Sequence, residues 1–226
     1  MEKSKHVADQ ATVISVEQWH ERATLCELLV RSLKCPDPVL AQAVASGTWA
    51  QAAGELADSL SLSLPPNWDA ELSGYAHNLD SDSLFHLLRI EYTRLYAQAP
   101  RSAVIPYEGS WHAAKKGERP LLFVNAEALA VGEACRFLGL ERGGDANDSL
   151  DSVVIELEVL WCIALMAAGI LACPKDVVAK EAWESFFEQH VTSWMDGFAE
   201  DTLSETDEPF YKATAYMLQA FVKSLG

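Results

Sequence analysis

The chain has 226 residues, half of them apolar, and its 33 acidic and 17 basic side chains give a net charge of −16. This length allows one sizeable domain or two small ones, and the apolar content is sufficient for a buried core, which argues against a disordered chain. The charge argues against nucleic acid or an anionic lipid surface as the main partner, because like charges repel. It allows a basic partner, although it also serves solubility.

The start of the chain and the cysteines favour a reduced, cytoplasmic protein. No apolar segment follows the polar start, so we predict no signal peptide. The longest uncharged apolar run, 159–173, has about 15 residues, fewer than the roughly 20 of a membrane span, and predicts a buried helix. The five cysteines form no CxxC pair and no cluster with histidine, which supports neither zinc nor a disulfide framework.

The first segment of the chain has the pattern of amphipathic helices. Ser15 and Gln18 have the spacing of a capping box, and apolar residues then recur at intervals of four and three as far as Leu33. Asp37 followed by proline predicts the start of a second helix, which Gly47 ends. Two helices are therefore expected before residue 48.

Two more helices are expected before the middle of the chain. Thr48 and Gln51 repeat the spacing of a capping box. The acidic stretch 80–82 is interpreted as the cap of a further helix, because carboxylates stabilise a helix N-terminus. The apolar stripe of that helix consists of Leu84, Leu88, Tyr92 and Leu95.

Residues 97–120 lose this periodicity and are predicted to form a long irregular connection, because they contain three prolines and two glycines. The remaining helices are expected over 125–138, 150–172, 176–189, 190–203 and Pro209–Leu225. No segment has the pattern of a strand. The sequence therefore predicts an all-α bundle of about ten helices, a single domain over 1–226 with two helical halves (about 1–96 and 121–226) joined by the loop 97–120.

The residue pattern offers no catalytic, metal or cofactor site. Glu17 and His20 share a helix face, but di-iron bundles need two such motifs and two further glutamates, so we expect a solvated face. Glu156 and Glu158 point about 200° apart on a helix and cannot form one acid–base pair; one is expected inside and the other at the surface. His190 is interpreted as a core histidine. Neither a phosphate-binding loop nor a nucleophile elbow is present.

Aromatic residues and prolines gather around the irregular connection. They are Tyr92, Tyr96, Pro100, Pro106, Tyr107 and Trp111. Such residues make rigid apolar surfaces that dock peptides, and Glu91, Glu108 and Asp151 would add negative charge nearby. The same aromatic residues would equally serve to attach a long connection to the core, and the pattern leaves both interpretations open.

Two neighbouring motifs carry a resemblance to a known family. Residues 91–96 read EYTRLY and residues 106–111 read PYEGSW. Together they resemble the signature of the TorD/DmsD/NarJ family, in which E-Y-x-R-L-F precedes P-P-Y-E-S-V-Y/W. Stretches 151–158, 190–198 and 209–213 are similar to three further family patterns, and the likeness spans roughly residues 15 to 224.

This resemblance implies an all-helical cytoplasmic chaperone and not an enzyme. Family members bind the apo form of a molybdopterin oxidoreductase, often through its twin-arginine leader peptide, support cofactor insertion and delay export. The peptide-binding positions that the resemblance implies are Tyr92, Leu95, Tyr96, Pro106, Tyr107, Trp111 and Asp151. Together with Asp151, Glu91 and Glu108 are expected to meet the arginines of the leader, whose guanidinium groups pair with carboxylates.

Departures from the family pattern leave the client open. Ser152 replaces the family histidine, Gly109 replaces a serine, and Gln98-Ala99-Pro100 replaces a Gly-Pro. Two other functions remain: a NarJ-like assembly factor for a nitrate-reductase-type catalytic subunit, and a helical enzyme dependent on a metal or on carboxylates. A monomer and a domain-swapped dimer are both compatible with the long connection. If the acidic residues bind the leader, binding weakens with added salt.

Overall fold

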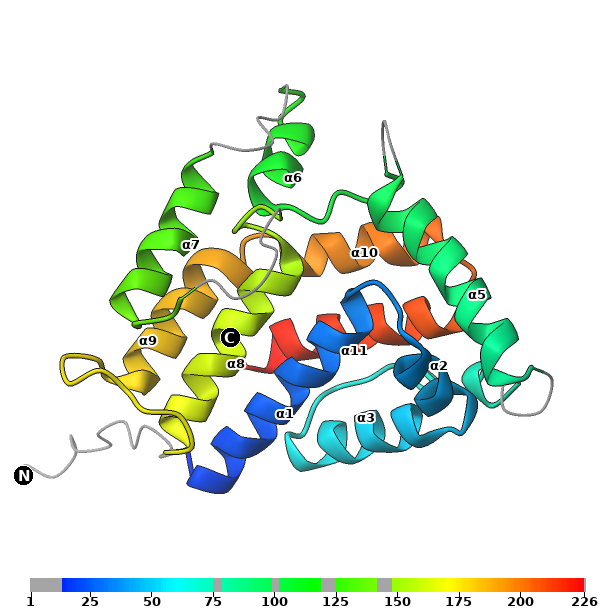
Figure 1. The fold of residues 1–226 in the computed structure, drawn as a ribbon, viewed down its shortest axis with the longest axis horizontal. Helices are drawn as coiled ribbons and strands as arrows, with labels where there is room; N and C mark the ends of the chain where they lie inside the picture. The colour runs from blue at the N-terminus through cyan, green and yellow to red at the C-terminus, as the bar shows by residue number, and fades with distance from the viewer. Residues whose placement is uncertain (1–13, 75–78, 99–101, 119–124, 142–147, 226) are drawn as a thin grey trace, which may run out of the picture.

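A computed structural model gives the fold (Figure 1), and it describes residues 14–74, 79–98, 102–118, 125–141 and 148–225. Over these residues the chain forms ten α-helices and no strand, which confirms the all-α prediction. The helices are α1 (Val16–Leu33), α2 (Pro38–Ala45), α3 (Thr48–Ser59), α5 (Ser81–Tyr92), α6 (Glu108–Lys115), α7 (Ala126–Phe137), α8 (Val153–Ala167), α9 (Ala179–Phe186), α10 (Met195–Glu205) and α11 (Pro209–Leu225). Three short turns accompany them: the 3₁₀ turn η1 (Leu72–Gly74) and the π-helical turns η2 (Thr93–Ala97) and η3 (Phe187–Val191).

Several helices begin at the caps that the sequence predicts. The Ser15 hydroxyl accepts a bond from the Gln18 amide, and the Gln18 side chain accepts one from the Ser15 amide, which completes the capping box of α1. Asp80 accepts a bond of 2.8 Å from the Ser83 amide at the start of α5. These caps satisfy amides that a helix N-terminus leaves without partners, so the acidic stretch 80–82 needs no metal to explain it.

Several predicted helix ends are wrong, including the predicted start at residue 190, since α10 begins at Met195. At α3 the cap is Gly47, with φ 77° and no side-chain cap, so the spacing of Thr48 and Gln51 is not a capping box. The predicted helix 150–172 is shorter at both ends: α8 begins after Ser152, which caps it, and ends before Gly169, whose φ of 73° lies in the left-handed region. Glycine adopts this conformation without strain, and it ends the helix before Pro174 is reached.

The predicted irregular connection also differs from the structure. Residues 97–120 contain a helix, α6, over Glu108–Lys115. The sequence did not predict this helix, because Pro106 and Gly109 are residue types that are typical of loops. Pro100 and Pro120 lie outside the described residues.

The core takes side chains from both predicted halves of the chain. Helix α1 packs against α8 and α11, and α11 also packs against α10 (Figure 1). Buried aromatic rings contribute to this core; the rings of Trp19 in α1 and Trp183 in α9, for example, lie 5.5 Å apart at a steep angle. In the part of the chain that the structure describes, no helix is both long and apolar enough to cross a membrane.

Short backbone contacts position α6 at the edge of this core. The Glu108 amide donates to the Asp151 carbonyl over 2.8 Å, and the Val153 amide donates to the Pro106 carbonyl over 3.0 Å. The start of α6 is thereby attached to the start of α8. The Val104 amide similarly donates to the Leu95 carbonyl over 2.8 Å, which attaches the same segment to η2.

Candidate peptide-binding site

A cavity of about 810 Å³ lies between η2, the segment that leads into α6, and the start of α8. This volume is in the range of small-molecule and side-chain pockets. Its walls are mainly aromatic and apolar and include Tyr92, Tyr96, Ile105, Pro106, Tyr107, Val154 and Phe198. The two family-like motifs, 91–96 and 106–111, therefore meet at one cavity.

Two exposed carboxylates, Glu118 and Asp148, also line this cavity. Burial raises the pKa of the Tyr107 hydroxyl, and the negative charge of Asp148 raises it further. Burial likewise raises the pKa of Tyr92 to about 12. Both tyrosines are consequently neutral near pH 7, and the acidic character of the cavity comes from Glu118 and Asp148. Neither carboxylate was predicted from the sequence, because no motif includes them.

Four of the nine predicted site residues line the cavity. Tyr92, Pro106 and Tyr107 are half-buried there. Tyr96 is buried more deeply, and its hydroxyl shares a hydrogen bond of 3.2 Å with Thr202. These residues present rings at the cavity and reach into the core behind it.

Leu95 and Trp111 belong to the walls and do not line the cavity. Leu95 is completely buried. The Trp111 ring lies against α10, where its Nε1 donates to Asp201 over 2.9 Å. A Cβ atom at Gly197 would lie only 2.5 Å from the Trp111 ring, so the ring is in direct contact with the backbone of α10. Trp111 thus holds α6 against α10.

Glu91 is engaged within the chain. Its carboxylate forms an ion pair of 2.7 Å with Arg94 and accepts a hydrogen bond from Thr206. The bond from Arg94 is the largest cause of a lowered pKa for Glu91. The Arg94 guanidinium also donates to the Glu205 carbonyl, so this pair connects the end of α5 to the end of α10. In this conformation Glu91 does not line the cavity.

Asp151 is completely buried and organises the start of α8. Its carboxylate accepts bonds from the Gly109 amide over 3.0 Å, from the Asn125 side chain over 2.8 Å, and from the Ser149 hydroxyl. A Cβ atom at Gly109 would lie 2.7 Å from Asn125 Cγ, which accounts for glycine at the position where the family pattern has serine. In this conformation the Asp151 oxygens face partners in the chain and not solvent.

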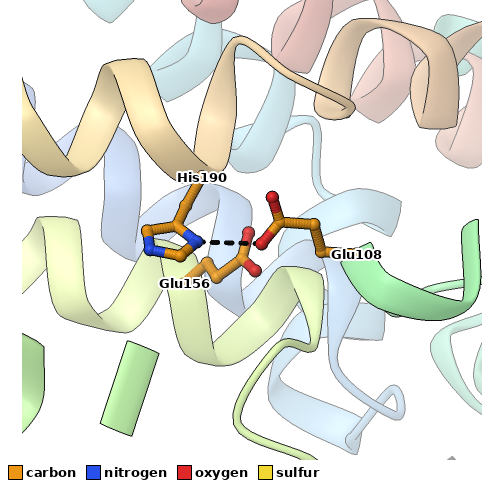
Figure 2. Close-up of side chains that lie close together, drawn as sticks. All are labelled: Glu108, Glu156 and His190. Atoms are coloured by element: carbon orange, nitrogen blue, oxygen red, sulfur yellow. Dashed lines mark hydrogen bonds and ion pairs between the residues drawn. The ribbon is translucent and has the colours of Figure 1, made fainter. Parts of the chain in front are cut away.

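Glu108, the first residue of α6, is also buried and meets two other segments (Figure 2). The His190 ring of η3 shares a hydrogen bond of 2.8 Å between its Nδ1 and Glu108 Oε2. The Ser193 hydroxyl donates to Oε1 over 3.0 Å, and His112 Nε2 lies 3.7 Å from the same oxygen. His190 is therefore a core histidine with a polar partner, as predicted from the sequence.

Glu156 completes this buried cluster from α8 (Figure 2). Trp194 Nε1 donates to Glu156 Oε2 over 2.9 Å. Burial raises the pKa of Glu156 well above its ordinary value, and the nearby charge of Glu108 raises it further. Glu158 lies on the other side of α8, is partly exposed and forms an ion pair with Lys34. The prediction that these two glutamates face different environments is confirmed.

The cluster of Glu108, Glu156 and His190 has the residue types of a metal site, and its ligand atoms lie within 4.8 Å of one another. Hydrogen bonds within the chain already occupy both oxygens of Glu108 and one of Glu156. The arrangement is a hydrogen-bonded network that connects three helical segments. Glu17 and His20 are exposed on α1, in agreement with the predicted solvated face.

The fold and the cavity define a class: an all-helical protein with an aromatic-lined cavity where η2, α6 and the start of α8 meet. A family model described as "Nitrate reductase delta subunit" matches residues 47–200, more than half of the chain. The chain belongs to this family, the TorD/DmsD/NarJ family of redox-enzyme maturation chaperones. No curated protein and no solved structure matches the chain.

Family membership confirms the resemblance and settles the general activity. The protein is a chaperone for molybdoenzyme assembly, and its partner is a molybdoenzyme catalytic subunit. The family is non-catalytic, so the alternative of a helical enzyme falls away.

Proposed function

We propose that this chaperone binds the apo form of a molybdopterin oxidoreductase through its twin-arginine leader peptide, in the cavity between η2, α6 and α8. The observation that carries the proposal is the cavity itself, which joins the two family-like motifs and has aromatic walls. Binding there would take place in the cytoplasm, while the client awaits its cofactor, and would delay export.

The chemistry of such a leader matches the two parts of the cavity. A twin-arginine leader carries two fixed positive charges followed by an apolar segment. Tyr92, Pro106 and Tyr107 offer apolar surface for that segment. Glu118 and Asp148 offer carboxylates to the arginines. The charge of −16 would accelerate encounter with a basic peptide.

The nine predicted site residues take two roles in this proposal. Tyr92, Tyr96, Pro106 and Tyr107 contact the peptide, because they line the cavity. The others hold its walls through their contacts within the chain: Glu91, Leu95, Glu108, Trp111 and Asp151. Neutralising Glu91, Glu108 and Asp151 together would therefore also weaken the fold, which makes that variant a poor test of leader binding.

The two carboxylates at the cavity, Glu118 and Asp148, offer a sharper test. We expect the double variant Glu118→Gln, Asp148→Asn to bind a synthetic leader peptide about tenfold more weakly by calorimetry, from the loss of two exposed ion pairs of about 0.7 kcal/mol each. The matched control is Glu55→Gln, Asp58→Asn on α3, far from α6 in Figure 1. Wild-type affinity should fall with added salt, and that of the cavity variant should fall less. Equal losses in the two double variants would reject the cavity as the arginine site.

A second candidate function is favoured by the matching family, which is named after a nitrate reductase subunit. In this version the protein acts on a nitrate-reductase-type catalytic subunit and needs no intact leader. Deleting the leader from the co-expressed client separates the two versions. Loss of the complex supports leader binding, and an unchanged complex supports the second candidate.

A further inference from the structure

Two buried carboxyl groups, Glu108 and Glu156, meet where α6, α8 and η3 come together (Figure 2). Glu156 is completely buried and Glu108 is 3% exposed. Two adjacent carboxylates in such a place repel each other, and each loses its hydration. One of them is expected to keep its proton, as in other buried carboxyl pairs.

The hydrogen bonds indicate which of the two keeps it. Glu108 Oε2 shares a hydrogen bond with His190 Nδ1 and its Oε1 accepts from Ser193, so both of its oxygens have polar partners and it is suited to the charged form. Glu156 accepts only from Trp194, and no donor among the described residues reaches its buried Oε1. A protonated Glu156 becomes a donor itself and has Glu108 as a neighbouring acceptor.

Among the described residues, no cation with a fixed charge compensates Glu156. The titratable groups near it are Glu108 from α6, which also meets His112, His190 from η3, and Asp151 before α8. Two of these are carboxylates, and both raise the pKa of Glu156. Burial is the largest cause of the same shift.

The cluster lies directly behind the cavity. Glu108 is bonded in sequence to Tyr107, and Glu156 lies within one helical turn of Val153 and Val154; all three neighbours line the cavity. Trp194 continues the network into the segment that precedes α10. The ionisation state of Glu156 therefore bears on how firmly α6 and α10 are held against α8.

We propose that Glu156 is a positioning residue that works as a neutral carboxylic acid: it joins Glu108 to Trp194 behind the cavity, and its ionisation loosens the α6 wall and weakens leader binding. This inference rests on the proposed function for its second half. Its first half, the neutral acid, concerns the fold alone and is tested separately.

The sign of the pH dependence follows from the raised pKa. Below the ordinary glutamate range both the folded and the unfolded chain carry the proton. As the pH rises above that range, the unfolded chain loses its proton first, so the folded state loses stability until Glu156 itself ionises. Over that interval Glu156 raises the equilibrium constant of unfolding by up to about tenfold per pH unit.

The test compares wild type with Glu156→Gln and with the control Glu158→Gln, which changes the partly exposed glutamate of the same helix. The amide of Glu156→Gln mimics the neutral acid, so we expect its stability to increase relative to wild type as the pH rises from about 4.5 to about 8. Glu158→Gln should follow wild type. Parallel curves for wild type and Glu156→Gln would overturn the neutral acid.

Calorimetry with the leader peptide tests the second half. When the pH is raised through the ionisation of Glu156, which ¹³C NMR of the wild-type glutamate carboxyl groups locates, wild type and Glu158→Gln should lose at least about threefold in affinity that Glu156→Gln retains. A flat difference together with diverging stability curves overturns the positioning role alone. Absence of peptide binding at every pH overturns the proposed function and this half with it, while the stability curves still decide the first half.

Two further measurements address a variant that does not fold and a metal bound at the cluster. If Glu156→Gln does not fold, ¹³C NMR of wild-type glutamate carboxyl groups decides: one carboxyl that stays protonated near neutral pH supports the neutral acid, and none overturns it. Titration of chelator-treated wild type with Zn²⁺ tests the cluster as a metal site. If Zn²⁺ binds stoichiometrically and Glu156→Gln abolishes this binding, the claim that Glu156 is a neutral acid is overturned and the cluster is a metal site.

Discussion

The contact between Trp111 and Gly197 gives a prediction in which one substitution has opposite effects at two sites. A Cβ atom at Gly197 would lie 2.5 Å from Cζ2 and 2.9 Å from Cη2 of Trp111. At Gly54, inside α3, an added Cβ atom meets nothing within 4 Å. Both glycines are helical, so Gly→Ala adds the same gain in helix propensity at each.

The magnitudes follow from these contacts. Gly54→Ala should raise the free energy of unfolding by about 0.5–1 kcal/mol, because alanine restricts the unfolded chain. Gly197→Ala has the same gain, but moving the Trp111 ring costs about 1–3 kcal/mol, which is typical of an overfilled site. The two variants should therefore differ by about 1–3 kcal/mol, with Gly197→Ala the less stable.

Urea unfolding measures this difference, which corresponds to a shift in midpoint of about 1 M at a typical urea dependence of about 2 kcal/mol per molar. Because Trp111 attaches α6 to α10, Gly197→Ala should also weaken leader binding, whereas Gly54→Ala should leave it unchanged. If Gly197→Ala proves as stable as Gly54→Ala and binds the peptide normally, Trp111 does not hold the cavity wall as described.

Three further outcomes are expected. Tyr96→Phe removes the hydrogen bond to Thr202 but keeps the ring, so chemical unfolding should show a loss of about 1 kcal/mol with little change in peptide affinity; a large loss of affinity would contradict this. Ser152→Ala removes the cap of α8 and should cost about 0.5–2 kcal/mol in the same assay; unchanged stability would contradict a role for this cap. The hydrogen bond from Arg94 lowers the pKa of Glu91, so the pair stabilises the fold at pH values above the ordinary glutamate pKa, and this contribution is lost as the pH falls through the lowered pKa. Acid unfolding should therefore be less steep in Arg94→Gln, and identical acid profiles would refute the contribution of the pair.

Local signals in the sequence were sufficient for most helix starts. The caps at Ser15, Asp80 and Asn125 are made within three residues, so spacing alone reveals them. Thr48 shows the limit of this approach: the same spacing occurs there, but Gly47 takes the cap position. Helix α6 has only a weak signal in the sequence: Glu108 begins it and basic residues end it, as the helix dipole favours.

The site depended on contacts that spacing does not encode. Glu108 and His190 are 82 positions apart, and their bond of 2.8 Å exists only because α6 and η3 pack together. The carboxylates of the cavity, Glu118 and Asp148, come from two loops with no motif between them. The sequence resemblance found the aromatic residues of the cavity, but it could not distinguish residues that line it from residues that hold its walls.

Photo-crosslinking of a leader peptide tests the central claim most directly. A photoreactive group placed in the apolar segment after the two arginines should react with residues that line the cavity, Tyr92, Tyr107 or Val154 among them. Unlabelled leader peptide should suppress these adducts by competition. Adducts confined to the separate groove between α1 and α2, lined by Trp49 and Trp161, would contradict the proposed cavity.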